Sequence, residues 1–336
     1  WISTGSIENS NFTNNNATYG GAIRGAVNAK DCTFDQNTAF DGNGGGIDMT
    51  IDGTVFPTLS SVVSIQDCIF TDNKAKGEYA PRGDAKGGKS QGGAIHSYKI
   101  EGMVIDNITC TGNTAFRGGA IDLYEMNFTT ISNSKFEENE ATLGGGIAVV
   151  GDNCNFTNLT MSYNVGNDGE YDDGHEFLDG QGGGIWVNGS NTRFENSTLD
   201  NNMATFGGGI MSLGDDGAFV NNTLTENNAA MGGAIAVDSG DDDPQAENIT
   251  FFNNTIQDNY AFLGGGGVFV QGDDVNFTDN DISYNEATTG GAFWVYGNHL
   301  YVENLTSIEN TAQNGGSSAV YSCDGLVVKN STFIGN

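Results

Sequence analysis

Apolar and polar residues alternate along the chain in short stretches that Gly, Asn and Asp separate. In one such stretch the apolar positions are Ile147 and Val149, followed by Phe156, Leu159 and Met161. Alternation over three to five residues predicts β-strands, because neighbouring side chains of a strand point to opposite faces. No segment combines helical spacing with capping residues over the length of a helix. The chain is therefore expected to be all β.

A Gly-Gly motif, followed by a small and then an apolar residue, recurs along the whole chain. Complete copies begin at Gly20, Gly44, Gly92, Gly118, Gly144, Gly182, Gly207, Gly232, Gly265 and Gly290, and a degenerate copy begins at Gly315. A second motif, apolar-x-x-Asn, precedes nearly every copy, as in Leu199 to Asn202, and the uninterrupted period is 25 or 26 residues. A unit this short cannot bury its own apolar face, so the units must stack on one another.

Three short strands per repeat, with equivalent residues one above another, predict a parallel β-helix of about twelve rungs and about 55 Å in length. The glycines suit a corner where φ is positive or where another backbone approaches closely. The recurring Asn suits a turn, because its amide tolerates the left-handed conformation and can bond its own backbone or the Asn of the next rung. The Ala two residues later is expected at a tight corner, and the matched apolar residues are expected to form internal stacks.

The composition shows no break along the chain, so we expect one continuous domain, residues 1–336. Loop insertions are expected near 48–66, 74–91, 165–181 and 239–247. Pro57, Pro81 and Pro244 fall in these insertions, where a missing ladder donor does no harm. The sequence starts at Trp1 without a leader, which indicates a mature product or an excised segment.

The second and third insertions share a register, three rungs apart, and carry opposite charge. The basic residues are Lys74, Lys76, Arg82, Lys86 and Lys89, and the acidic ones are Asp168, Glu170, Asp172, Asp173, Glu176 and Asp179. We expect the two insertions to meet, within one molecule or between neighbours. Reversing the charge of Lys86 and Lys89 without effect at low salt would contradict this. Arg82-Gly83-Asp84 matches the tripeptide that integrins read, a match that most often arises by chance.

The paired motifs Gly-Gly-Ala-Ile and Phe-x-x-Asn, seen at Gly20–Ile23 and Phe12–Asn15, resemble those of chlamydial polymorphic outer-membrane proteins and similar right-handed β-helix proteins. The resemblance covers essentially the whole chain. It implies a right-handed coil and an exported surface passenger concerned with adhesion. The family's C-terminal membrane barrel has no counterpart in this sequence, and acidity and sequon density are not part of the family pattern. The resemblance transfers no catalytic residue.

The charge balance limits the partners of this protein. There are 43 acidic and 12 basic residues among 336, which gives a formal charge of -31. This balance argues against nucleic acids and anionic membranes as partners, because phosphate binding draws on clustered Lys and Arg. No apolar run approaches the roughly 18 residues of a membrane helix.

Sequons for N-linked glycosylation are frequent, and several are expected to carry glycans because turns expose them in a secreted chain. They lie at Asn11, Asn16, Asn107, Asn127, Asn155, Asn158, Asn188, Asn196, Asn221, Asn248, Asn253, Asn276, Asn304 and Asn330. Half of them (Asn107, Asn158, Asn196, Asn221, Asn253, Asn304 and Asn330) share one register, so their glycans would cover one edge. The alternative is that a repeat rich in Asn, Ser and Thr generates sequons automatically.

Acidic turns follow the Gly motif and form a candidate calcium site at Asp215, Asp216, Asp241, Asp273 and Asp274. Stacked carboxylates repel one another, and Ca²⁺ would relieve that repulsion. The favoured alternative is a solvated acidic face, because no known calcium motif is matched. No other cofactor is indicated.

Five cysteines, Cys32, Cys68, Cys110, Cys154 and Cys323, are too few and too scattered for a disulfide scaffold or a zinc site. Cys32 and Cys68 occupy the same position of successive rungs, which would bring them within bridging range. A disulfide between them is one expectation, and packed free thiols are the other.

No catalytic residue can be assigned. Arg117 and Arg193 are isolated in the repeat, and the spacing indicates no partner for His96, His175 or His299. The expected function is therefore that of an extracellular, non-catalytic structural or adhesive glycoprotein, a stalk or fibre subunit that stacks end to end on further copies. The alternatives are a carbohydrate-active enzyme, either a polysaccharide lyase or a glycoside hydrolase, and an archaeal halophile surface glycoprotein that would unfold at low salt.

Overall fold

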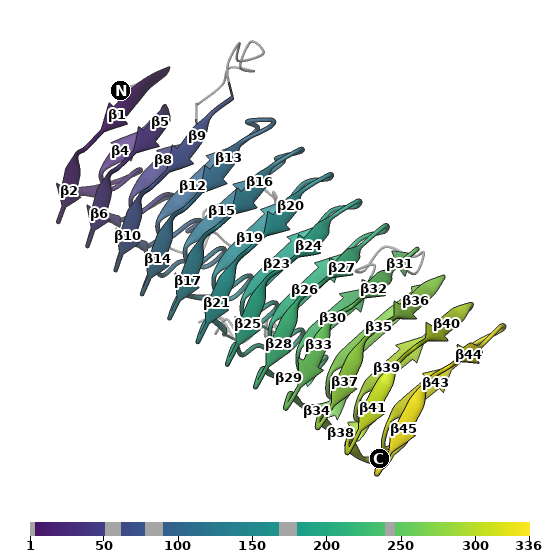
Figure 1. Ribbon diagram of the computed structural model, residues 1–336. Coiled ribbons are helices and arrows are strands. Elements are labelled where there is room, and N and C mark those ends of the chain that lie inside the picture. The colour runs from purple at the N-terminus through teal and green to yellow at the C-terminus, as the bar shows by residue number, and fades with distance from the viewer. Residues whose placement is uncertain (1–3, 51–61, 78–89, 168–179, 239–245) are drawn as a thin grey trace, which may run out of the picture.

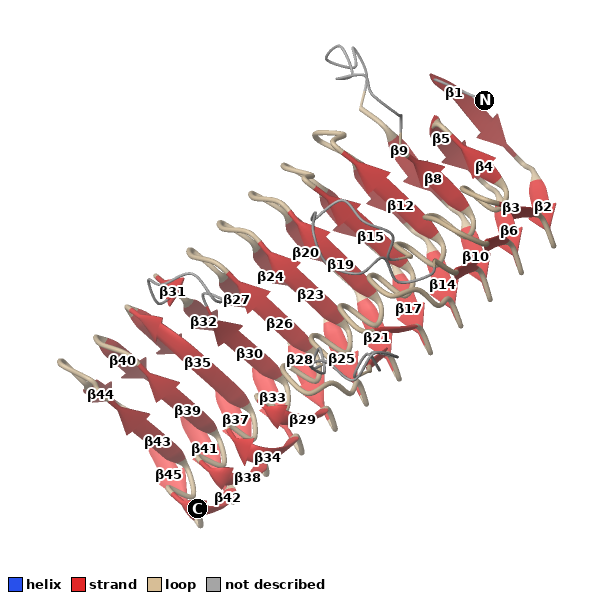
Figure 2. Cartoon of the chain, turned by 180° about the vertical axis from the view of Figure 1, so that it is seen from behind, coloured by secondary structure: helices blue, strands red, loops and turns tan. Residues whose placement is uncertain are grey.

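The computed structural model describes residues 4–50, 62–77, 90–167, 180–238 and 246–336. Their rungs stack in chain order into a rod, with the N-terminus at one end and the C-terminus at the other (Figure 1). Every paired strand has a parallel partner one rung away, as Figure 2 shows from behind. The predicted parallel β-helix is confirmed. No helix long and apolar enough to cross a bilayer occurs among these residues.

Each rung contributes, in chain order, to three long sheets A, B and D and to a short sheet C between B and D. Sheet A contains β1 (Thr4–Glu8), β5 (Ala26–Lys30), β9 (Ser64–Gln66), β13 (Val104–Asp106), β16 (Thr130–Ser132), β20 (Asn155–Thr157), β24 (Arg193–Glu195), β27 (Ala218–Val220), β32 (Thr250–Phe252), β36 (Val275–Thr278), β40 (Leu300–Glu303) and β44 (Val327–Lys329). Sheet B contains β2 (Asn11–Thr13), β6 (Thr33–Asp35), β10 (Ile69–Thr71), β14 (Thr109–Thr111), β17 (Lys135–Glu137), β21 (Thr160–Ser162), β25 (Thr198–Asp200), β28 (Thr223–Thr225), β33 (Thr255–Gln257), β37 (Asp281–Ser283), β41 (Thr306–Ile308) and β45 (Thr332–Ile334).

Sheet D contains β4 (Ile23–Arg24), β8 (Ile47–Met49), β12 (Ile95–Tyr98), β15 (Ile121–Tyr124), β19 (Ile147–Val150), β23 (Ile185–Asn188), β26 (Ile210–Leu213), β30 (Ile235–Asp238), β35 (Val268–Asp273), β39 (Phe293–Tyr296) and β43 (Ser318–Tyr321), and β31 (Ala246–Glu247) also pairs with β35. The short sheet C is made of β3 (Asn16–Ala17), β7 (Thr38–Ala39), β11 (Lys74–Ala75), β18 (Glu140–Ala141), β22 (Val165–Gly166), β29 (Asn228–Met231), β34 (Tyr260–Gly264), β38 (Glu286–Thr289) and β42 (Thr311–Asn314). The three strands predicted per rung are therefore joined by a fourth, shorter one in many rungs.

The core consists of stacked identical or similar side chains, as predicted from the repeat. In sheet A the rings of Phe156, Phe194, Phe219, Phe251 and Phe277 stack with centroids 4.5 to 5.1 Å apart. This distance matches the spacing of parallel strands, so a residue stacks on its own equivalent. Burial of these side chains gives the rungs a common core.

A ladder of buried asparagines lies at the corner between sheets B and C. Asn202 is typical: its Nδ2 donates to Oδ1 of Asn227 one rung on and to the carbonyl oxygen of Met161, each at 3.0 Å. The predicted Asn-to-Asn bonding is confirmed. The left-handed residue, however, is the one before the Asn, such as Asn201 with φ of 54°. The Asn itself points inward, because only there can its amide satisfy buried backbone carbonyls.

The Gly-Gly pair shows both features expected of it, a positive φ and a close approach of another backbone. Gly207 has φ of +61°, whereas a Cβ on Gly208 would lie 2.3 Å from the carbonyl oxygen of Gly233. The expected alanine corner is wrong. Ala229 and Ala261 are paired neighbours within sheet C, where a small residue allows the chain to pass close to the core.

The described residues show where the second and third insertions leave the coil, and the ends of the first and fourth expected ranges lie in β8, β9 and β31. The second insertion lies between β11 and Gln91, and the third lies between β22 and Gln181. Both insertions therefore lie between sheets C and D. Lys74 and Lys76 are described, with Lys74 in β11, whereas the other charged residues of the two insertions and the Arg82-Gly83-Asp84 tripeptide lie outside the described residues. The contact between the two insertions stays a prediction.

Candidate functional site

The sequon asparagines lie on the surface of the rod. Twelve of the fourteen are exposed, and the other two, Asn127 and Asn276, are half-buried. The seven that share a register occupy the corner between sheets A and B, each with positive φ, for example 54° at Asn221 and 53° at Asn253. Their amides bond from rung to rung, with Asn253 Nδ2 2.9 Å from Asn221 Oδ1. The predicted edge of acceptor sites exists, and its glycosylation stays a prediction.

The acidic turns bond the backbone of the next rung. Asp215 Oδ1 accepts from the N–H of Glu247 at 2.9 Å, and Asp273 Oδ1 accepts from the N–H of Asn298 at 2.6 Å. Asp216 accepts from the Asn248 amide, while Asp274 lies 3.2 Å from His299 Nδ1. No group of three or more His, Cys, Asp or Glu suited to a metal occurs within the described ranges, and Asp241 lies outside them. Asp215 and Asp273 thus cap backbone N–H groups, Asp216 and Asp274 pair with side chains, and calcium binding stays a prediction.

The cysteine prediction requires a correction. Cys32 and Cys68 are stacked neighbours, each one residue before a paired sheet B strand, but both are free thiols in the structure. Each Sγ is directed to the carbonyl oxygen two residues earlier, Lys30 at 3.1 Å and Gln66 at 3.0 Å. The two thiols lie beside each other, and each is directed to a carbonyl oxygen of its own rung. Burial raises the pKa of Cys68 to about 12, which leaves it a poor nucleophile.

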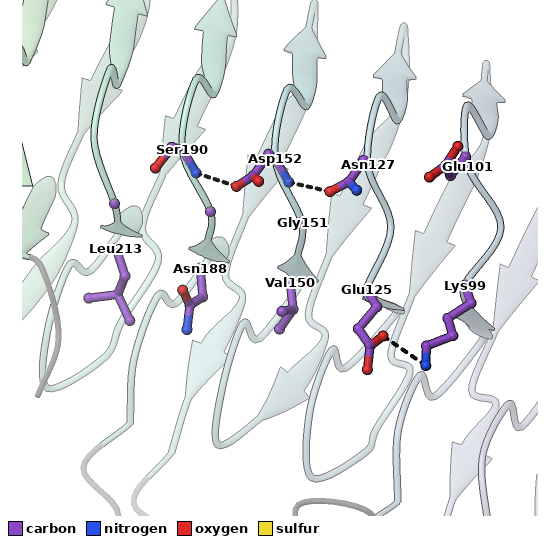
Figure 3. Close-up of a pocket in the computed structure, with 12 residues that line it drawn as sticks. Lys99, Glu101, Glu125, Asn127, Val150, Gly151, Asp152, Asn188, Ser190 and Leu213 are labelled. Carbon is purple, nitrogen blue, oxygen red and sulfur yellow. Dashed lines mark hydrogen bonds and ion pairs between the residues drawn. The ribbon is translucent and has the colours of Figure 1, made fainter. Parts of the chain in front are cut away.

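An open groove of about 630 Å³ follows the corner between sheets D and A (Figure 3). Its floor is the backbone of Gly151, Gly189 and Gly214, which occupy the same position in three successive rungs. A Cβ on Gly151 or Gly189 would lie 2.0 or 2.1 Å from a carbonyl oxygen of the preceding rung. In the two rungs before, this position carries Lys99 and Glu125, whose ion pair of 3.0 Å closes one end. The hollow exists because tight turn packing excludes side chains from its floor.

The two walls of the groove differ in character. One is formed by the strand-end residues Val150, Asn188 and Leu213, and the other by the turn residues Asn127, Asp152 and Ser190 (Figure 3). The turn wall is fixed by hydrogen bonds: the Asp152 N–H donates to Asn127 Oδ1 and the Ser190 N–H to Asp152 Oδ1, both at 2.8 Å. The Asn188 amide has no hydrogen-bond partner among the described residues. It is available to a ligand.

A row of buried ionisable side chains crosses the outer face of sheet D. Asp48, His96 and Asp122 are paired one rung apart, and His96 Nδ1 lies 2.8 Å from Asp122 Oδ2. Arg117 donates from Nη2 to Asp122 Oδ2 at 3.0 Å and from Nε to Oδ1. Burial opposes ionisation of Asp122, but Arg117 and His96 outweigh it and lower its pKa. Burial raises the pKa of Asp48.

The exposed fractions of His96 and Asp122 are 2% and 0%, so neither reaches a substrate in this structure. The row joins β8, β12 and β15. The sequence interpretation of His96 and Arg117 as lacking partners is wrong, since both bind Asp122. Two signals could have found this site: Asp122 follows His96 by one period of 26 residues, and Arg117 precedes it by five.

The five-residue spacing recurs in two other rungs, where the residue before the Gly pair also contacts an outward residue of sheet D. Trp186 Nε1 donates to Gln181 Oε1 at 2.8 Å, and Arg24 lies over the ring of Tyr19 at 4.6 Å. Arg193 is bonded to Glu195 at 2.8 Å, and His175 lies outside the described residues.

Two family models match this chain. The model of the right-handed beta helix region matches residues 183–336, and the model of the Chlamydia polymorphic membrane protein repeat matches 31–49 and 67–98. The resemblance drawn from the paired motifs is confirmed, and the fold is a right-handed parallel β-helix. A comparison with curated protein sequences gives no match.

Solved structures of similar architecture include the surface adhesin PfbA of Streptococcus pneumoniae, at 12% identity and a TM-score of 0.41 over 96% of this chain and 83% of that one. A second PfbA structure has a TM-score of 0.40 at 12% identity, over 96% and 91%. The catalytic unit of a GH87 alpha-1,3-glucanase from Streptomyces thermodiastaticus has a TM-score of 0.42 at 14% identity, over 98% and 62%. Likeness at this level does not indicate a shared function.

Proposed function

We propose that this protein is a non-catalytic, extracellular surface element, a rod with N-linked glycans along one edge that serves adhesion or structure. The observation that carries the proposal is the row of exposed, register-matched sequon asparagines at the corner between sheets A and B. Glycan acceptors must be exposed in an exported chain, and this corner meets that requirement at every one of the seven positions. The matched polymorphic membrane protein repeats support a surface location.

The geometry also suits a mechanical role. Side-chain ladders bond each rung to the next inside the rod, as at Asn202, and outside it, as at Asn253. A solenoid of this kind keeps its outer faces at fixed positions, because each rung is held by two neighbours. Such faces present repeated contacts to a partner surface, which favours multivalent adhesion.

The test uses the full chain secreted from a eukaryotic host. Its intact mass should fall by several glycans after enzymatic deglycosylation, and Thr198→Val with Thr223→Val should remove two register-matched acceptors and lower the initial mass. Beads coated with the protein should adhere to cell or matrix surfaces above uncoated beads. An unchanged mass would contradict the glycan edge, and absent adhesion would contradict the adhesive role. Release of reducing sugars from polysaccharides would favour the alternative of a carbohydrate-active enzyme.

A further inference from the structure

We infer that the groove between sheets D and A binds a neutral, hydroxyl-rich glycan chain. This inference rests on the proposed adhesive function and names the ligand class of that surface. The groove, which the sequence did not predict, is defined by the glycine floor at Gly151, Gly189 and Gly214 and by the two walls described above.

The shape of the groove fits an extended chain. Its lining spans five rungs, from Lys99 to Leu213, or about 19 Å at the spacing of parallel strands. The volume of about 630 Å³ lies within the usual range of ligand sites. A floor without side chains at Gly151, Gly189 and Gly214 allows one face of a sugar ring to lie against the backbone.

The walls offer the mixed chemistry that sugar rings require. The Asn188 amide supplies both donors and an acceptor, and the second carboxylate oxygen of Asp152 supplies an acceptor. Val150 and Leu213 lie on either side of Asn188 and present apolar surface to the C–H faces of a ring. Hydroxyl groups pair well with such amides and carboxylates.

A tyrosine pair extends the strand-end wall beyond the groove. Tyr98 and Tyr124 occupy the same row as Val150, with ring centroids 5.8 Å apart and planes 19° from parallel. Arg117 lies 4.5 Å from the Tyr124 centroid, and Lys99 lies 4.7 Å from that of Tyr98. Arg117, which is bonded to the buried Asp122, holds the Tyr124 ring, and the exposed Lys99 holds the Tyr98 ring. Rigid aromatic faces bind ligands at low entropic cost.

The charge of the groove selects a neutral ligand. Glu101, Glu125 and Asp152 line it against one cation, Lys99. The surplus of negative charge repels uronate, sulfated and phosphorylated polymers. Because Asn188 is itself a sequon residue, a glycan attached there would occupy the groove, so the test requires a chain without N-glycans.

The experiment screens the full chain, produced in a host without N-glycosylation, against arrayed neutral and anionic oligosaccharides and measures the affinity for the best one by calorimetry. A neutral oligosaccharide should bind. Asn188→Ala and Asp152→Ser should each weaken it at least tenfold, the Ser keeping a capping oxygen as Ser190 does one rung on. Asn155→Ala is the matched control, because it removes an equally exposed sequon asparagine from sheet A and should leave the affinity unchanged.

The inference is overturned if no neutral glycan binds, if anionic glycans bind better, or if the two groove variants bind as the unmodified chain does while their circular dichroism is unchanged. Adhesion separates it from the proposed function. Beads carrying a groove variant that adhere fully would remove the groove from adhesion and leave the adhesive function intact, whereas unmodified beads that adhere to nothing would overturn the adhesive function itself.

Discussion

The second glycine of each Gly-Gly pair has no room for any side chain. At Gly208 the position of a Cβ is 2.3 Å from the Gly233 carbonyl oxygen and 2.6 Å from that of Asn228. At Gly209, by contrast, the nearest atom is the Ala234 carbonyl oxygen at 2.8 Å. Alanine occupies this third position in several rungs, which shows that the coil can give way there. Glycine is therefore required at the second position by close backbone contact, whereas at the third position alanine can replace it.

We therefore expect Gly208→Ala to lower the free energy of unfolding by at least about 3 kcal/mol, because two rigid backbones would have to separate. Gly209→Ala is the matched control and should cost about 1 kcal/mol or less. Urea unfolding followed by circular dichroism measures both. Equal destabilisation by the two variants would show that the close approach at Gly208 is not the constraint.

Strands of sheet D bring together side chains that the chain separates by a full period. Asp48, His96 and Asp122 point away from the core yet are buried, and Arg117, the residue before one Gly pair, folds over Asp122. Farther along the same row the outward residues Ala148, Trp186, Met211, Ala236 and Phe269 form a second apolar cluster. The outer face of sheet D is thus charged and buried at one end and apolar and buried at the other.

Asp122→Asn should lower the free energy of unfolding at pH 7 by about 3–5 kcal/mol, because it leaves Arg117 without its buried partner. The folded-state pKa of Asp122 is lowered, so its stabilisation is complete above the unfolded-state pKa of about 3.9 and is lost as the pH falls through the folded-state value. The difference in the free energy of unfolding between the variant and the unmodified protein should be constant from pH 7 to about pH 5 and should shrink below about pH 4.

Urea titrations across this pH range measure the difference. Asp31→Asn is the control, since Asp31 is exposed at a left-handed corner where other rungs have Asn, and it should change stability by no more than about 0.5 kcal/mol. An equal difference for Asp122→Asn at pH 3 and pH 7 would contradict the assigned ionisation.

The whole rod carries a formal charge of -31. Equivalent carboxylates stand one rung apart, closer than the screening length of about 10 Å at 0.1 M salt. Their repulsion acts on the folded state throughout its length. The hydrogen bonds of the acidic turns, such as that from the Asn298 N–H to Asp273, hold these charges in place without neutralising them.

The thermal midpoint should therefore rise by a few degrees between about 10 mM and 0.5 M NaCl, because salt screens the repulsion. Differential scanning fluorimetry with KCl as a second salt checks that screening and not ion identity is responsible. A midpoint that falls or stays level would contradict the expectation. Unfolding at the lowest salt would instead favour the halophilic surface protein considered from the composition.

The sequence by itself determined the coil. Its period, the Gly-Gly pair and the recurring Asn predicted stacked parallel strands, the Asn ladder and the common corner of the second and third insertions, because a repeat of about 25 residues places each residue on its own equivalent. Sequence patterns did not locate the Ala residues in a fourth strand, because strands of two to five residues give too few positions to show a periodicity.

Only the tertiary structure decided which side chains of neighbouring rungs contact one another. His96 and Asp122 meet only when the period is closed, and Arg117 joins them only because its segment folds back over sheet D. Likewise, Cys32 and Cys68 are neighbours whose thiols are each directed to a carbonyl oxygen of their own rung. The groove follows from three glycines whose turns pack too closely for a Cβ. Such contacts depend on side-chain direction and turn spacing, which stacking in register leaves undetermined.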